Sequence, residues 1–180
     1  MARRFAVVIG GLLTATNAAA QSRVALDLNT HSEVTIDRPA AAIWPLIVDP
    51  NSWKQGSKNW HHSGPVGQLG EVFAAGDPAN KAKVEFMIEN VQLVPNQLRT
   101  IKIYAPNGPL LGFAIWSLKE SAGKTVVAYD VYSEEPVDSA QIKSKTPAQL
   151  DQAERDYVTT NQQRFDRELI ALKRMVETGK

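Results

Sequence analysis

The sequence predicts an α+β fold in which a curved antiparallel sheet wraps around a long C-terminal helix, with a short broken helix near the N-terminal side. Three observations support this fold class. Segments between residues 64 and 132 are rich in β-branched and aromatic residues and are separated by turn signals. Stretches near residue 40 and after residue 146 carry helix signals instead. A sheet with one apolar face must bury it, and the final helix is the only large apolar partner available.

The first predicted strand covers residues 32–37, where Val34 and Ile36 alternate with polar residues. A short helix is expected next, over residues 40–48, because the proline before it suits a first helical turn. Pro45 lies deeper in that segment. Because proline lacks an N–H group and clashes with the preceding turn, we expect Pro45 to kink or split the helix.

The central region predicts an antiparallel meander, because its strand-like segments are joined by short turns rich in Gly, Pro and Asn. The predicted strands are Glu71–Ala75, Ala82–Val94, Leu98–Tyr104, Leu111–Lys119 and Thr125–Tyr132. Apolar residues recur at period two around Phe86 and around Tyr129. We therefore expect each of these two residues to face the covered side of the sheet.

The C-terminal helix has the strongest signals. Residues 146–149 read Thr-Pro-Ala-Gln, a capping box with proline at the first helical position. Apolar residues then recur every three or four positions, which places them on one face of a helix. A helix over residues 147–177 is about 45 Å long at the standard rise per residue, long enough to lie across a whole sheet. Gly179 is the expected stop.

The first twenty residues, MARRFAVVIGGLLTATNAAA, predict a cleaved export signal. Arg3 and Arg4 precede an apolar run at residues 5–13, and three alanines at 18–20 form a signal-peptidase site. The alternative is a membrane anchor, but a spanning helix needs about 20 apolar residues and this run is shorter. The expected organisation is a signal peptide (1–20), a flexible segment (21–31) and one ligand-binding domain (32–178), with a periplasmic or secreted location.

Composition narrows the function classes. Cleavage would leave 160 residues, and loss of the two signal arginines changes the formal net charge from +1 to −1. A nearly neutral chain argues against a nucleic-acid partner, which requires a basic surface. The chain has no cysteine, so disulfides and thiolate chemistry are excluded. No segment after the signal is apolar enough for stable membrane insertion.

The order of these elements resembles the START-like superfamily (SRPBCC), also called the Bet v 1-like or polyketide cyclase/dehydrase and lipid-transport group. The residues that carry the resemblance are Ile36-Asp37-Arg38-Pro39, Ile43-Trp44, Asp49-Pro50, Trp53, the Gly67–Gly70 lead into a strand, Trp116, Gly123–Tyr129 and the long final helix. It covers nearly the whole mature chain. The resemblance implies a helix-grip fold whose cavity receives an apolar or amphipathic small molecule.

Residues on the expected inner surface are the candidate ligand-binding residues. They are Phe86, Trp116, Tyr129, Tyr157, Asn161 and Phe165. Ligand pockets are mostly apolar walls with a few placed polar groups, although aromatic residues at these spacings also form ordinary cores. Asn161 interrupts the apolar face of the helix, so it is expected to orient a ligand, to bond a neighbouring side chain, or to be exposed.

Trp60-His61-His62 is the most prominent cluster of chemically active residues. Two histidines can bind a metal or transfer protons, but adjacent residues on an extended chain point to opposite sides. We therefore favour surface or pocket-rim histidines and predict neither a metal site nor a cofactor. No nucleophile elbow, phosphate loop, metalloprotease motif or dinucleotide fingerprint is present, and no catalytic residue is assigned.

The sequence thus favours an exported binding protein that holds a hydrophobic or amphipathic small molecule, lipid-like or polyketide-like, in an internal cavity. One alternative is a cyclase- or dehydratase-type enzyme that acts on a cyclic or polyketide-like substrate. Another is an interaction module whose surface, for example residues 133–145, contacts a partner. The sequence predicts no oligomeric state.

Overall fold

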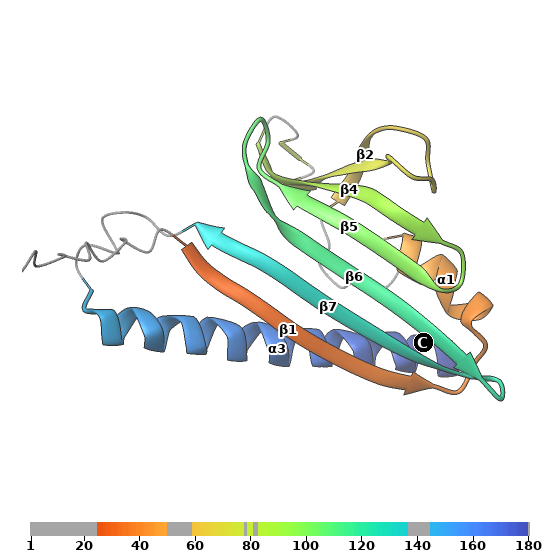
Figure 1. Ribbon diagram of the computed structural model, residues 1–180. Helices are drawn as coiled ribbons and strands as arrows, with labels where there is room; N and C mark the ends of the chain where they lie inside the picture. Colours follow the sequence, from red (N-terminus) through yellow and green to blue (C-terminus); the bar gives the residue numbers. More distant parts are fainter. Residues whose placement is uncertain (1–24, 50–58, 78, 81–82, 137–144, 180) are drawn as a thin grey trace, which may run out of the picture.

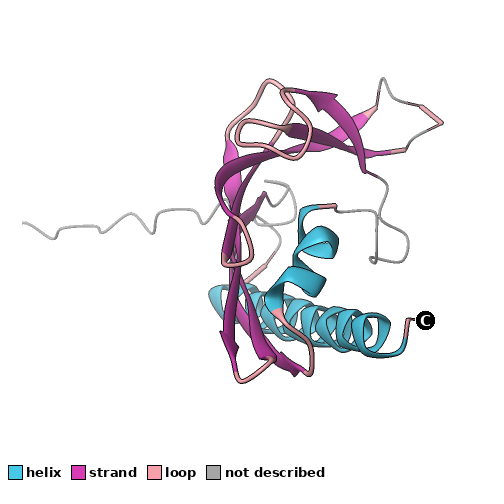
Figure 2. Cartoon of the chain, turned by 90° about the vertical axis from the view of Figure 1, so that its right-hand side faces the viewer, coloured by secondary structure: helices cyan, strands magenta, loops and turns pink. Residues whose placement is uncertain are grey.

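A seven-stranded antiparallel sheet curves around the C-terminal helix, as Figure 1 and Figure 2 show for the computed structural model. The structure describes residues 25–49, 59–77, 79–80, 83–136 and 145–179. The expected signal peptide and Trp53 lie outside the described residues. The predicted fold class, a helix-grip α+β fold, is confirmed.

The strands are β1 (Ala25–Ile36), β2 (Asn59–Ser63), β3 (Val72–Gly76), β4 (Val84–Val94), β5 (Leu98–Tyr104), β6 (Leu110–Ser121) and β7 (Lys124–Pro136). The helices are α1 (Ala40–Val48) and α3 (Pro147–Thr178). The strand order is β1-β7-β6-β5-β4-β3-β2, so all neighbours are consecutive in the chain except β1 and β7. β1 pairs with β7 over its whole length.

Strand β1 begins at Ala25, seven residues before the predicted start at Ser32. Residues 25–31, which we expected to be flexible, therefore belong to the sheet. The alternation of inner and outer positions does continue through them, but Thr30 and Ser32 occupy buried inner positions. Because these two residues are polar, the alternation was not visible as an apolar pattern.

Two further local features differ from the sequence expectation. The polar segment around His61 forms strand β2, which pairs with β3 at the edge of the sheet.

Helix α1 is continuous across Pro45, so this residue does not split it. Proline removes only one helical hydrogen bond from a helix of this length, and Ile43 and Ile47, which are fully buried, hold α1 against the core.

Helix α3 begins and ends as predicted. Thr146 and Gln149 form the reciprocal capping box, and Gly179 closes the helix in the left-handed conformation. Its buried residues are Asn161, Phe165, Leu169 and Leu172. The closest contacts of α3 with the sheet are on β1, and those of α1 are on β6. Both helices lie within the concave side of the sheet in Figure 2.

One hydrophobic core joins the inner face of the sheet to both helices. It includes Val127 from β7, Ile43 from α1 and Leu172 from α3, all with no exposed surface. Within the described part of the chain, no helix is both long and apolar enough to cross a bilayer.

This packing predicts very different effects for two neighbouring helix residues. Leu169 is 1% exposed and Ile170 is 62% exposed. Leu169→Ala should lower the free energy of unfolding by about 2–5 kcal/mol, because it leaves a cavity in the core. Ile170→Ala should change it by less than about 0.5 kcal/mol. Chemical denaturation measures both values, and equal effects would contradict the assigned face of α3.

Candidate functional site

Three aromatic side chains form a continuous wall between the sheet and α3. Trp116 and Tyr129 lie directly opposite each other on β6 and β7, and their rings stack with centroids 3.9 Å apart. Phe165 of α3 meets the Tyr129 ring edge-on, with a centroid distance of 5.2 Å. All three residues are buried. The stacked and edge-on geometries are those that aromatic quadrupoles favour, so the wall is well packed.

The other predicted site residues adjoin this wall. Phe86 on β4 and Tyr157 on α3 are partly buried and pack against the same core. Asn161 is 8% exposed, and its Nδ2 donates a hydrogen bond to the Tyr157 carbonyl oxygen at 2.9 Å. Asn161 is therefore buried and bonded within its own helix, so the alternative in which it is exposed is wrong. Ligand contact by these residues stays a prediction.

Arg99 is a buried cation that the sequence analysis missed. It lies on β5, is 3% exposed, and faces the interior directly opposite Trp116. Its Nε donates to Oδ1 of Asn90 at 2.8 Å, and its Nη1 donates to the carbonyl oxygen of Ile47 in α1. Its Nη2 is fully buried and has no hydrogen-bond partner among the described residues.

The strand pattern explains why Arg99 points inward. It alternates with Ile101 and Ile103 along β5, and Ile101 is buried on the same face. Asn90 continues the inner positions of β4 in the same way, opposite Ile101. A polar residue in phase with apolar neighbours was therefore the signal that could have located both Arg99 and Asn90.

Burial lowers the pKa of Arg99 from its ordinary value to about 10, because the apolar interior disfavours the charged form. Nearby Tyr129, Glu71 and Asp49 act in the opposite direction and favour the charge. A pKa of about 10 still leaves the guanidinium protonated at neutral pH. The inner face of the sheet thus carries a permanent positive charge.

Glu71 is a second buried polar residue on this face, next to Asn90, whose backbone N–H donates to the Glu71 carbonyl oxygen at 2.9 Å. It is 2% exposed, and its Oε2 accepts a hydrogen bond from the backbone N–H of Gly67 at 2.7 Å. Its Oε1 lies 3.2 Å from Nδ1 of His61. Gly64, in the same turn, has φ +81°, and a Cβ there would lie 2.2 Å from the Gly70 oxygen, so the turn requires glycine.

His61 therefore pairs with a buried carboxylate, although both His61 and its neighbour His62 are exposed. Among the described residues, no group of three or more metal-ligating side chains could hold an ion.

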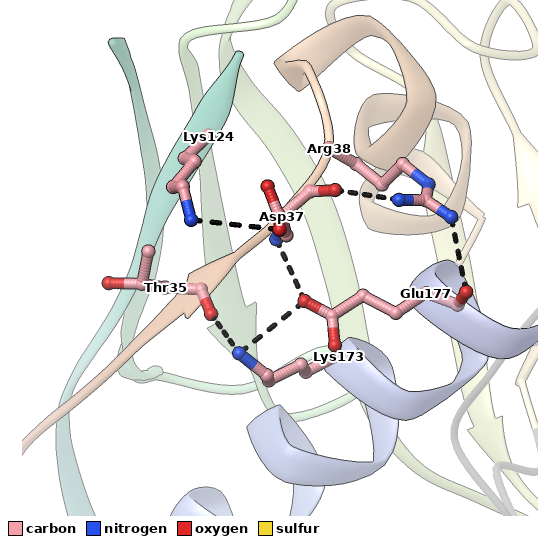
Figure 3. A pocket seen from close by; sticks show the side chains of 6 residues that line it. All are labelled: Thr35, Asp37, Arg38, Lys124, Lys173 and Glu177. Atoms are coloured by element: carbon pink, nitrogen blue, oxygen red, sulfur yellow. Dashed lines mark hydrogen bonds and ion pairs between the residues drawn. The ribbon is translucent and has the colours of Figure 1, made fainter. Parts of the chain in front are cut away.

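A separate surface hollow of about 400 Å³ lies at the end of α3 (Figure 3). Its lining residues are Thr35, Asp37, Arg38, Lys124, Lys173 and Glu177. Glu177 accepts a hydrogen bond from the Asp37 N–H at 2.8 Å and lies 3.4 Å from Nζ of Lys173. Lys124 lies 3.6 Å from Asp37. Two ion pairs thus form here, and Arg38 donates to the backbone oxygens of Asp37 and Glu177, so the end of α3 is fastened to the β1–α1 junction.

Comparison with known proteins shows the fold. No family model matches the chain, and no curated protein is significantly similar to it. Solved structures do match. Protein SA2116 from Staphylococcus aureus has a TM-score of 0.61 at 13% identity, covering 86% of this chain and 96% of that one. Truncated norcoclaurine synthase from Thalictrum flavum has a TM-score of 0.57 at 11% identity, covering 88% and 98%.

The Aha1 dimer from Colwellia psychrerythraea matches with a TM-score of 0.56 at 14% identity, covering 85% of this chain and 98% of that one. These structures share a START-like fold. The resemblance that the sequence predicted is therefore confirmed at the level of the fold.

The hydrogen bond between Asn90 and Arg99 predicts a large effect of a small substitution. Asn90→Ala should lower the free energy of unfolding by about 2–3 kcal/mol, because it leaves the Nε of a buried cation without a partner. Gln92→Ala, on the exposed side of the same strand, is the control and should cost less than about 0.5 kcal/mol. Urea denaturation of both variants checks this, and a neutral Asn90→Ala would contradict the assigned interaction.

The charged residues at the end of α3 predict an acid-sensitive contact. The hydrogen bond from the Asp37 N–H, helped by Lys173, lowers the pKa of Glu177. A lowered folded-state pKa stabilises the protein above the ordinary glutamate pKa, and that contribution is lost as the pH falls through the lowered value. Unfolding free energy should therefore fall more steeply with acidification in wild type than in Glu177→Gln. Parallel pH profiles for the two proteins would contradict this contact.

Proposed function

We propose that this protein is an exported binding protein that holds a hydrophobic or amphipathic small molecule against the inner face of its sheet. The observation that carries the proposal is an apolar inner surface that the described helices cover only in part. The helix backbones approach the sheet mainly at β1 and β6, and α1 also meets β5 through the hydrogen bond from Arg99 to Ile47. On β4 and β5, the inner-facing Phe86 and Ile103 remain partly exposed while packing against the buried core.

This arrangement favours a ligand because exposed apolar surface costs about 25 cal/mol for each Å². Phe86 and Ile103 extend the surface formed by the aromatic wall of Trp116, Tyr129 and Phe165. A small apolar molecule on β4 and β5 would cover the exposed part and contact the wall at its edge. The fold shared with norcoclaurine synthase and other START-like structures supports binding of a hydrophobic small molecule.

The rival functions receive less support. Two of the polar side chains on which the enzyme alternative depends, Asn161 and His61, already have protein partners. For the interaction module, residues 133–136 belong to β7, and residues 137–144 lie outside the described residues. Binding is therefore the function that we carry forward.

Export is the second part of the proposal and rests on residues 1–20. Expression of the full precursor should yield a denatured mass that corresponds to cleavage after Ala20. Retention of the full-length mass in the exported fraction, or absence of the protein from that fraction, would contradict export. Native mass spectrometry of the same sample would reveal a retained ligand as excess mass.

Binding at β4 and β5 can be tested with a neutral fluorescent probe, N-phenyl-1-naphthylamine. The probe should gain fluorescence with wild type. Phe86→Ala should weaken its affinity by about tenfold, since a large apolar contact is lost. Phe113→Ala is the matched control, because Phe113 is an aromatic residue on the outer face of β6, 37% exposed, and should leave affinity unchanged. No fluorescence gain, or equal effects of the two substitutions, would overturn the proposed site.

A further inference from the structure

The charge of Arg99 is not matched by any direct ionic partner. Its two protein hydrogen bonds go to neutral acceptors, the side-chain oxygen of Asn90 and the backbone oxygen of Ile47. None of the ion pairs between described residues includes Arg99. A buried cation without a carboxylate partner is costly, and such groups are normally paired.

The nearest buried carboxylate does not complete the site. Glu71 favours the charge of Arg99 from a distance, but both of its oxygens are engaged, one by His61 and one by the Gly67 N–H. The unpartnered Nη2 of Arg99 therefore remains as a buried donor with no acceptor in the described protein. An unsatisfied donor on a charged group costs more than one on a neutral group.

A purely structural role accounts for only part of this geometry. Nε and Nη1 connect β4 to the end of α1, and a structural bridge needs no more than these two groups. The third nitrogen, Nη2, adds a charged donor next to the aromatic wall, because Arg99 lies opposite Trp116. Guanidinium groups match carboxylates well in both charge and planar geometry.

We propose that the ligand is an anionic amphiphile whose single carboxylate head group binds Nη2 of Arg99 while its apolar tail lies along the inner face of β4 and β5. This rests on the proposed function and names the chemical class of its ligand. One positive charge without a direct ionic partner matches a monoanion, whereas the carboxylates of Glu71 and Asp49, which already favour this charge, disfavour a head group with two negative charges. Nη2 is enclosed in the unliganded protein, so the head group displaces the side chains that cover it.

The test compares two probes with the same chain length, decanoate and the neutral decanol, by displacement of N-phenyl-1-naphthylamine at neutral pH. Wild type should bind decanoate about tenfold more tightly than decanol, or more, because hydrogen bonds to charged groups are the strong ones. The double variant Arg99→Met/Asn90→Leu should lose this preference and still bind decanol. Replacing Arg99 and Asn90 together avoids leaving either polar side chain without the other, although the Ile47 carbonyl oxygen loses its donor.

Lys102→Met is the matched control. Lys102 lies three residues along β5, pairs with Glu89 at 2.6 Å, and faces the side of the sheet opposite Arg99. This variant removes the same charge from the same strand, so it should keep the preference for decanoate. If it lost the preference as fully as the double variant, general electrostatic attraction would explain the result and the anchor would be overturned.

The remaining outcomes separate the inference from the proposed function. Equal wild-type affinities for decanoate and decanol would overturn the carboxylate anchor but leave apolar binding standing. If the fluorescent probe binds but neither decanoate nor decanol displaces it, the proposed carboxylate anchor for an amphiphile of this class is overturned. Absence of probe binding itself would contradict the proposed function as well. A ¹³C-carboxyl shift of labelled decanoate on binding to wild type provides a readout that needs no variant.

Discussion

The need to bury one face of a strongly curved sheet determines most of this structure. Seven antiparallel strands present a common inner face, and α3 and α1 lie against it. Each helix covers a limited part, since α3 packs closest to β1 and α1 closest to β6. The same constraint that stabilises the fold therefore leaves apolar positions on β4 and β5 only partly covered. The proposed ligand completes this burial.

Arg99 connects the stability of the inner face with its selectivity. Its hydrogen bonds to Asn90 and Ile47 join the sheet to α1, so the guanidinium contributes to the position of the helix. Its charge, however, is more than such a connection needs, and desolvation makes that charge expensive. A protein that keeps a costly cation beside an aromatic wall has a physical means to prefer an anionic amphiphile over a neutral one.

The sequence predicted the elements better than it predicted the site. Period-two alternation found the central strands, and the capping box at Thr146 found the start of α3. The beginning of β1 was missed because Thr30 and Ser32 are polar at inner positions. Arg99 was missed because its inward phase on β5 reads as an exception among exposed charges. Its phase with Ile101 and Ile103 was the available signal, and the pairing of β5 with β4 and β6 shows that this position lies on the inner face.

For the aromatic residues, the sequence predicted their burial on the inner side of the sheet but did not determine whether they contact a ligand. Periodicity placed Trp116, Tyr129 and Phe165 inside, and the structure brings them into direct ring contact. Whether an inward aromatic residue belongs to a packed core or borders a ligand depends on which helix covers it. That depends on long-range packing, which a pattern along one strand does not contain.

The most direct test of this account is the location of a bound ligand. Crystals grown with a fatty acid that carries bromine at its terminal carbon would locate the tail by anomalous scattering. The account predicts the bromine peak on the inner face near Phe86 and Ile103, with the carboxylate at Arg99. A peak on the outer face, for example beside the exposed pair Phe113 and Tyr132, would contradict it.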